Sequence, residues 1–220
     1  MSQAATASVT APGAPTAYPL LGPRRPRVRV QAPLVDLGRA EAAAAELLRA
    51  LGLPIDAEAM CDTPGRLTRA YHELLTVPEF EMTTFANDEV YDELVLINDI
   101  PVRSLCEHHL LPFVGVAHVG YVPGDRLLGL SKFARTVDFF ARRPQTQERL
   151  TSQIAAHMDE HLSPLGVGVV ISAEHSCMTL RGARAAGTRT HTCATRGVLR
   201  EDPAKRAEFL TRAHRSEESR

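Results

Sequence analysis

The sequence predicts an α+β domain with a mostly antiparallel β-sheet, preceded by a pair of helices. Apolar residues recur at helical spacing over residues 35–75, and from about residue 93 they form extended or alternating runs instead. The resulting order is helices, two strands, two helices, two or three strands and a last helix. At 220 residues and 44% hydrophobic composition, the chain can form one sizeable core with appendages.

Charge and composition exclude several function classes. Lys and Arg number 25 and Asp and Glu number 26, so the formal net charge of -1 provides no global attraction to nucleic acid or to anionic membranes. No apolar run approaches the roughly 20 residues of a membrane helix, and the N-terminus lacks the pattern of a secretory leader. The four cysteines are widely scattered, which favours reduced thiols or metal ligands over a disulfide framework. We therefore expect a soluble protein of the cytoplasm.

Residues 1–33 are predicted to form a disordered tail rich in proline and arginine. Such a composition buries too little apolar surface to offset the entropy lost on ordering. The functional alternative is a nucleic-acid-binding arm, although Tyr18 is the only aromatic residue there. The arginines that such an arm would use are Arg24, Arg25, Arg27 and Arg29.

Two helices are predicted in the N-terminal helical region, residues 34–92. The first follows the apolar pattern from Val35 to Leu53, and the second starts at Asp62-Thr63-Pro64, where an N-cap precedes a proline suited to the first turn. Pro78 ends the second helix. The acidic residues 79–92 are expected to be a connector.

The main domain, residues 93–220, is predicted to hold the sheet and three further helices. Its predicted strands are 94–97 and 100–102 leading into Cys106, 113–121, 166–171, 177–184 and 188–199. Its predicted helices start at Ser131, which can act as a cap, at Arg143-Pro144 and after Asp202-Pro203, and the first two end near Ala141 and Leu162.

Two short stretches carry a predicted metal site. Cys106 and His109 lie three residues apart in a turn and offer thiolate and imidazole, the ligands that zinc prefers. If residues 175–181 form a strand, Cys177 shares a face with His175; the alternative is a half-exposed strand with a buried cysteine. Cys106, His109 and Cys177 would leave one position of a tetrahedral zinc open for water, as in catalytic sites.

Two histidines beside these expected ligands are candidates for proton transfer. His108 and His175 are not needed as ligands and have side chains suited to acid and base work near neutral pH. The alternative for His175 is that it completes the metal coordination. Proton transfer is the role we predict for both.

A candidate anion site lies at the helix start after Gly129-Leu130. Ser131, Lys132 and Arg135 occupy its first turn, where backbone N–H groups favour an anion. With Arg181 they could clamp a polyphosphate. The alternative is an ordinary capped helix with solvated basic residues.

Glu148 is a candidate for base recognition. It lies in the first turn of its helix, where a carboxylate can complement the helix dipole or, facing a pocket, accept two hydrogen bonds from a guanine-like N–H/NH₂ edge. The i, i+4 pair His157 and His161 permits metal binding as well. Because this pair lies at one edge of an apolar stripe, we expect packed or half-exposed histidines there.

Several ordered motifs closely resemble the GTP cyclohydrolase I family. The similarity extends from Asp62-Thr63-Pro64 to Arg200-Glu201-Asp202-Pro203 and Phe209-Leu210. The motifs between these points are Cys106-Glu107-His108-His109-Leu110-Leu111-Pro112-Phe113, Gly129-Leu130-Ser131-Lys132, Arg142-Arg143-Pro144-Gln145, Gln147-Glu148-Arg149-Leu150-Thr151, His175-Ser176-Cys177-Met178 and Arg181-Gly182.

The resemblance implies a tunnelling fold (T-fold) for the catalytic domain, with an antiparallel sheet and helices on one face. It also implies a toroidal homo-oligomer, typically a decamer, in which sheets of neighbouring subunits join into a barrel. The implied reaction is the zinc-dependent conversion of GTP and water to 7,8-dihydroneopterin triphosphate and formate, which leads to pterins such as folate.

The same resemblance implies roles for individual residues. Cys106, His109 and Cys177 would hold Zn²⁺, and His108 and His175 would be the acid and base. Glu148 would hold the guanine. The other residues that would contact GTP are Gln147, Ser131, Lys132, Arg135, Arg181 and Arg66.

Two departures from the family pattern leave alternatives open. Cys193 lies where the family usually shows Thr and Ser, so it is either simply packed, a fourth metal ligand or a redox-sensitive thiol. The proline-rich N-terminal tail also differs from the shorter leaders common in the family. Other possible functions are a structural-zinc protein whose site Cys193 or His175 closes, and an enzyme of the same fold acting on a related pterin or deazapurine precursor.

Overall fold

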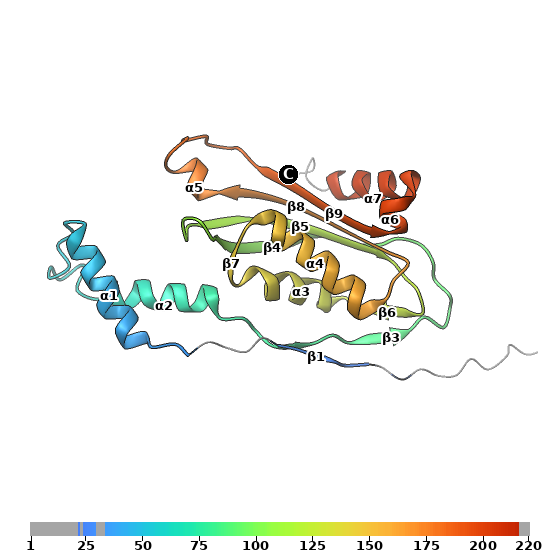
Figure 1. Cartoon of the computed structure of the whole chain (residues 1–220), viewed down its shortest axis with the longest axis horizontal. Helices are drawn as coiled ribbons and strands as arrows, with labels where there is room; N and C mark the ends of the chain where they lie inside the picture. Colours follow the sequence, from blue (N-terminus) through green and yellow to red (C-terminus); the bar gives the residue numbers. More distant parts are fainter. Residues whose placement is uncertain (1–21, 23, 30–33, 216–220) are drawn as a thin grey trace, which may run out of the picture.

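The computed structural model describes residues 22, 24–29 and 34–215, which form a five-stranded sheet with helices packed against it (Figure 1). The helices are α1 (Leu37–Ala50), α2 (Thr63–Leu75), α3 (Ser131–Ala141), α4 (Gln147–Leu162), α5 (Ser176–Thr179), α6 (Val198–Glu201) and α7 (Pro203–Arg215). The strands are β1 (Arg27–Val28), β2 (Phe80–Glu81), β3 (Thr84–Ala86), β4 (Val95–Cys106), β5 (Pro112–Val122), β6 (Arg126–Leu128), β7 (Pro144–Gln145), β8 (Gly166–His175) and β9 (Thr190–Gly197). None of these helices, within the described ranges, is long and apolar enough to cross a membrane.

The main sheet has the strand order β7-β4-β5-β8-β9. Strands β4, β5, β8 and β9 pair antiparallel, while the two-residue β7 runs parallel to β4. Most of β8 and the second half of β5 are buried, because their side chains pack against helices on both faces. The predicted α+β class with a mostly antiparallel sheet is confirmed.

Helices cover both faces of this sheet. On one face, α3 and α4 enclose the larger core, which includes Phe113, Ile154 and Val169. On the other face, Phe209 of α7 lies against the bare backbone of Gly168, where an added Cβ would be 2.6 Å from the ring. The expected helices on one face are α3 and α4, and α7 is an additional cover that the sequence pattern did not indicate.

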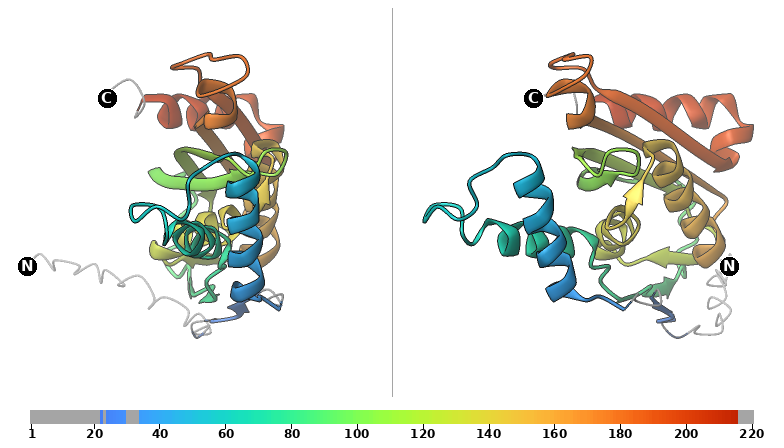
Figure 2. Two further views of the ribbon diagram at one scale, coloured as in Figure 1. Left: turned by 90° about the vertical axis from the view of Figure 1, so that its left-hand side faces the viewer. Right: turned by 60° about the vertical axis from the view of Figure 1, so that its left-hand side comes forward.

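The N-terminal helices α1 and α2 pack on each other and lie to one side of the sheet (Figures 1 and 2). They match the predicted helical pair. No residue of α1 is buried, and Leu47 and, just after the helix, Leu51 are exposed. The apolar stripe of α1 is therefore only partly covered by α2 within the described part of the chain.

Two small sheets occupy segments that are predicted to be a connector and a tail. Strand β1 pairs with β2 and β3 pairs with β6, and Val28 of β1 is buried. At residues 24–29 the expected tail is therefore paired backbone. The other residues of 1–33, apart from Gly22, lie outside the described residues.

Two helices begin differently from the prediction. The capping position of α3 is Leu130, with no side-chain cap, so Ser131 is not its N-cap. Pro144 lies in β7, and α4 begins only after Thr146, whose hydroxyl accepts a hydrogen bond from the Arg149 N–H. This cap places Gln147 in the first turn of α4.

Of the histidine pair on α4, His157 is packed as expected, whereas His161 is exposed. His157 is buried between Phe139, Phe140 and His161. Burial, with a smaller effect of the His161 charge, lowers the pKa of His157 to about 4. His157 is therefore a neutral core residue at physiological pH.

A hydrogen bond joins α2 to the turn between β4 and β5. The Tyr71 hydroxyl donates to the carbonyl oxygen of Leu110 at 3.0 Å. Leu110 has a φ of 51°, which non-glycine residues adopt only at a cost, so contacts must hold this turn in place. Tyr71 thus helps to fix the turn that carries Cys106 and His109.

We predict that Tyr71→Phe weakens zinc binding about fivefold, because one hydrogen bond of about 1 kcal/mol no longer holds the turn. Competition with a fluorescent zinc chelator measures the change. Tyr91→Phe is the matched control, since the Tyr91 hydroxyl has no hydrogen-bond partner among the described residues. Unchanged zinc affinity in Tyr71→Phe would show that the turn is fixed without α2.

Candidate metal centre and nucleotide site

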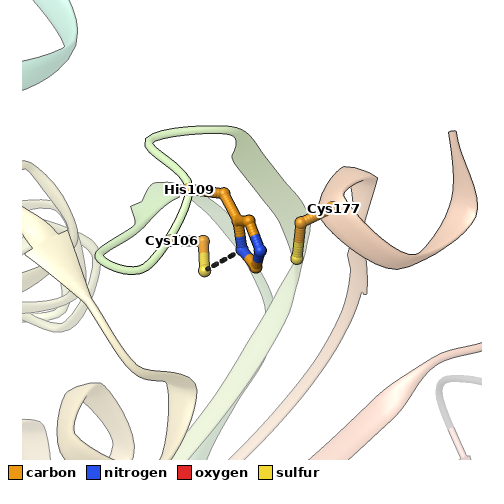
Figure 3. A group of neighbouring side chains, drawn as sticks. All are labelled: Cys106, His109 and Cys177. Carbon is orange, nitrogen blue, oxygen red and sulfur yellow. Dashed lines mark hydrogen bonds between the residues drawn. The ribbon is translucent and has the colours of Figure 1, made fainter. Parts of the chain in front are cut away.

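Cys106, His109 and Cys177 point toward one another (Figure 3). Their ligand atoms all lie within 4.8 Å of one another, and Cys106 Sγ is 3.7 Å from His109 Nδ1. Cys106 is buried at the end of β4, His109 is exposed in the following turn, and Cys177 is half-buried. Two distant parts of the chain thus form one cluster of three donors, as predicted.

Cys177 reaches this cluster from a helical turn and not from a strand. Strand β8 ends where α5 begins, so the predicted strand over residues 177–184, with His175 and Cys177 on a shared face, is wrong. The Ser176 hydroxyl donates to the carbonyl oxygen of Pro112, which holds α5 against the start of β5. The short helix therefore stays beside the turn that carries the other two donors.

The donor set fits a zinc ion. Burial and, next, the neighbouring Cys106 raise the pKa of the Cys177 thiol, while the Arg181 guanidinium acts in the opposite direction. Two adjacent thiolates repel each other unless a cation lies between them. Thiolate and imidazole are preferred zinc ligands, and three protein ligands leave one tetrahedral position open.

Neither residue considered as a fourth ligand belongs to the cluster. The His175 ring is hydrogen-bonded to Gln147 instead. Cys193 lies on β9 on the side of Arg206 in α7, whereas the preceding residue, Thr192, faces α4. Within the residues that the structure describes, the cluster therefore has three protein donors.

His108 lies beside the metal cluster and is 66% exposed. Its Nδ1 is 3.8 Å from Cys106 Sγ, and its Nε2 is 3.9 Å from the Glu107 carboxylate. Glu107 forms an ion pair with Arg149, whose Nε donates to Gln145 Oε1 at 2.9 Å. The sequence motifs contain Glu107 and Arg149, but their pairing across 42 residues has no sequence signal. Through it, α4 braces the turn that carries His108.

His175 is held in a defined orientation at the end of β8. Its ring stacks on Phe113, with centroids 4.5 Å apart and an interplanar angle of 10°. Burial lowers the pKa of His175, and the Glu148 carboxylate offsets part of this effect. The ring is therefore neutral near pH 7, as a proton-accepting base must be.

Glu148 and Gln147 are neighbours in the sequence but differ in solvent exposure and in hydrogen bonding. Glu148 is exposed, near His175, and has no ion pair or hydrogen bond to any other described side chain. Gln147 is 1% exposed and its amide contacts protein groups. A free carboxylate at this position is compatible with the predicted guanine contact.

Two of the candidate phosphate residues, Lys132 and Arg135, line a separate cavity of about 380 Å³. Lys132 and Arg135 of α3 meet Arg27 of β1 there, beside Glu79 and Glu81. None of the three cations has an ion pair within the described residues. Arg27 was considered from the sequence only for a nucleic-acid-binding arm, and its place beside α3 depends on the pairing of β1 with β2.

This cavity and the metal cluster lie toward opposite ends of α3. At the far end of the helix, the Ala141 carbonyl accepts a hydrogen bond of 2.7 Å from Ser104, two residues before Cys106. Because α3 has 11 residues, Ser131 lies on the order of 16 Å from that end along the helix axis. One chain therefore does not bring the phosphate residues of α3 to its own metal cluster.

The two other predicted phosphate contacts are also placed by the structure. Arg66 is paired with Asp62 on α2 at 3.0 Å. Arg181 follows α5 and is close enough to influence the Cys177 thiol. Of the predicted phosphate-binding residues, Arg181 alone is thus shown near the metal cluster by a described contact or charge effect.

Comparisons with known proteins identify the family of this chain. A family model described as GTP cyclohydrolase I matches residues 40–214. GTP cyclohydrolase 1 from Mycolicibacterium gilvum is 54% identical over 184 residues, which cover 81% of this chain and 91% of that protein. GTP cyclohydrolase 1 from Mycobacterium tuberculosis is 52% identical over 190 residues, which cover 84% of this chain and 92% of that protein. The chain belongs to the GTP cyclohydrolase I family, whose fold is the T-fold.

Proposed function

We propose that this protein is a GTP cyclohydrolase I, which opens the imidazole ring of GTP at C8 by hydrolysis, releases formate and forms 7,8-dihydroneopterin triphosphate for pterin and folate synthesis. The observation that carries the proposal is the three-donor cluster with two histidines that are not needed as ligands and a free carboxylate beside it. A purely structural zinc site would not need His108, His175 or Glu148. Relatives that are more than half identical to this chain carry the name GTP cyclohydrolase 1.

Different residues of the site would bind the metal ion and the guanine base. Cys106, His109 and Cys177 would hold Zn²⁺, which supplies the Lewis acidity that makes a water molecule nucleophilic near neutral pH. Glu148 accepts hydrogen bonds from the N1–H and 2-amino group of guanine. This contact holds one edge of the purine and leaves C8 and N7 on the opposite side of the base.

The two histidines supply proton transfer in the proposed mechanism. His175 is neutral before the reaction, so it can take a proton from the attacking water and return it to N7 as the ring opens. His108, on the exposed side of the cluster, is placed to move protons in the later loss of formate and rearrangement of the ribose.

We predict that the zinc-loaded protein releases formate from GTP and yields a fluorescent pterin after oxidation of the product. His108→Ala and His175→Ala should keep zinc and lose about 100-fold or more in kcat, as expected for a lost acid or base. Cys177→Ser should lose zinc. His161→Ala, an exposed histidine on α4, is the control that keeps both.

Absence of formate at high enzyme concentration would contradict the proposed reaction. If the two histidine variants shed zinc, the division between ligands and proton carriers would be wrong instead. Measuring zinc content and formate on the same samples separates these outcomes.

We further propose a toroidal homo-oligomer, with the decamer as the size typical of the family, in which one copy supplies the metal cluster and another supplies Ser131, Lys132 and Arg135. The separation of these groups along α3 supports this assignment. The outer edge of β9 pairs with no strand among the described residues, so a second copy can continue the sheet there. The exposed Leu47 of α1 offers further apolar surface for such contacts.

Mixed oligomers test this shared site. We predict that Cys177→Ser and Lys132→Ala chains, each inactive alone, recover about a quarter of the wild-type activity when they are assembled together at equal amounts. Random mixing places an intact metal cluster beside an intact phosphate-binding group in about a quarter of the sites. A mixture of Cys177→Ser and His175→Ala chains is the control. It should stay inactive, because both changes damage the half of the site that contains the metal cluster, so no copy supplies an intact half. No recovery in the first mixture would place the whole site within one copy.

We propose the cytoplasm as the compartment of this enzyme. All four cysteines are free thiols. Two of them have to stay reduced to bind zinc, and cytosolic glutathione and thioredoxin maintain that state.

A further inference from the structure

Gln147 is buried beside the site and has no role in the proposed mechanism. It is the first residue of α4 and is 1% exposed. The motif resemblance predicts a substrate contact for it. Its side-chain amide, however, is already hydrogen-bonded to four protein groups.

The contacts of the amide nitrogen determine which way the amide points. Nε2 of Gln147 lies 3.0 Å from the Ile171 carbonyl oxygen, 2.8 Å from the Thr190 carbonyl oxygen and 3.1 Å from Thr192 Oγ1. Carbonyl oxygens only accept hydrogen bonds, so the NH₂ group has to face them. A flipped amide would place its own oxygen against two carbonyl oxygens in a buried site, where unpaired acceptors are costly. Strands β8 and β9 therefore fix the orientation of this amide.

The fixed amide in turn determines that Nε2 of the His175 ring carries a hydrogen. Gln147 Oε1 lies 2.8 Å from His175 Nε2 and can only accept, so Nε2 has to carry a hydrogen. This holds for the neutral ring and for the protonated ring alike. Stacking on Phe113 keeps the ring in the plane that allows this contact. The remaining nitrogen, Nδ1, has no hydrogen bond to any described residue.

We propose that Gln147 is a positioning residue that commits Nε2 of His175 to a permanent hydrogen bond and makes Nδ1 the atom that exchanges protons during the reaction. The inference rests on the proposed function, because it assigns an atom to the acid and base work of His175. Gln147 touches no reacting atom in this arrangement. The base of GTP is left to Glu148, the exposed neighbour of Gln147.

Nitrogen-15 solid-state NMR of the zinc-loaded protein with labelled histidine tests the assignment without turnover. Protonated and unprotonated ring nitrogens have well-separated shifts, and the His175 signals are those missing from His175→Ala. At a pH where the ring is neutral, we expect the wild-type protein to show a protonated Nε2 and an unprotonated Nδ1. A wild-type ring with its hydrogen on Nδ1 would overturn the proposal, and this result needs no variant of Gln147 to fold.

Kinetics of Gln147→Met, which keeps the length of the side chain and removes the acceptor, tests the positioning role. We expect a mixture of His175 tautomers and a kcat at least about tenfold lower, with zinc content unchanged and the KM for GTP within about threefold of wild type. Thr192→Val is the matched control, because it removes one partner of the same buried amide and leaves both carbonyl contacts. It should keep the wild-type tautomer and a kcat within about twofold.

Two results separate this inference from its alternatives. A raised KM with unchanged kcat in Gln147→Met would make Gln147 a substrate contact and overturn the proposal. If the wild-type protein released no formate from GTP, the proposed reaction would fail, whereas the NMR spectrum would still decide which nitrogen of His175 carries the hydrogen.

Discussion

The antiparallel register of β4, β5 and β8 is the constraint on which the site depends. Leu105 lies opposite Pro112 and Phe113 lies opposite His175, so the end of β8 meets the turn that follows β4. Gly115 allows β5 and β8 to come this close, because a Cβ there would be 2.0 Å from a carbonyl oxygen of β8. A slip of one residue would turn every side chain of the strand to the opposite face and would separate His175 from its stack.

The N-terminal turn of α4 is the second element that organises the site. The Thr146 cap sets where the helix begins, and the three residues that follow face different partners. Gln147 contacts β8 and β9 behind the site, and Arg149 pairs with Glu107 in the metal-binding turn. Glu148, between them, remains exposed. The buried contacts of Gln147 thus hold the start of α4 in place, while Glu148 stays accessible to solvent.

Much of this arrangement was predictable from the sequence, and the failures have physical causes. The alternating pattern of β5 and the helical spacing of α3 and α4 are long enough to be recognised. The strands β1, β2, β3 and β7 have two or three residues each, which is too short for any periodicity. The packing of α7 on Gly168 requires contact between segments that are distant in the sequence.

The structure brings the three predicted donors together, although the strand predicted around Cys177 is absent. The prediction for Cys177 assumed a strand over residues 175–181, whereas the helical turn α5 places its sulfur beside Cys106 and His109. The sequence could indicate Lys132 and Arg135 as candidate anion ligands, yet it could not indicate that α3 separates them from the cluster of their own chain. Such information depends on how strands and helices are arranged in space.

In the proposed site, three residues bind zinc and no other protein group completes the coordination. X-ray absorption at the zinc edge of the zinc-loaded protein measures it most directly. We expect two sulfur ligands together with lighter ligand atoms, and the same spectrum in Cys193→Ser and His175→Ala. A third sulfur ligand in the wild-type protein, or the loss of a ligand in either variant, would contradict it.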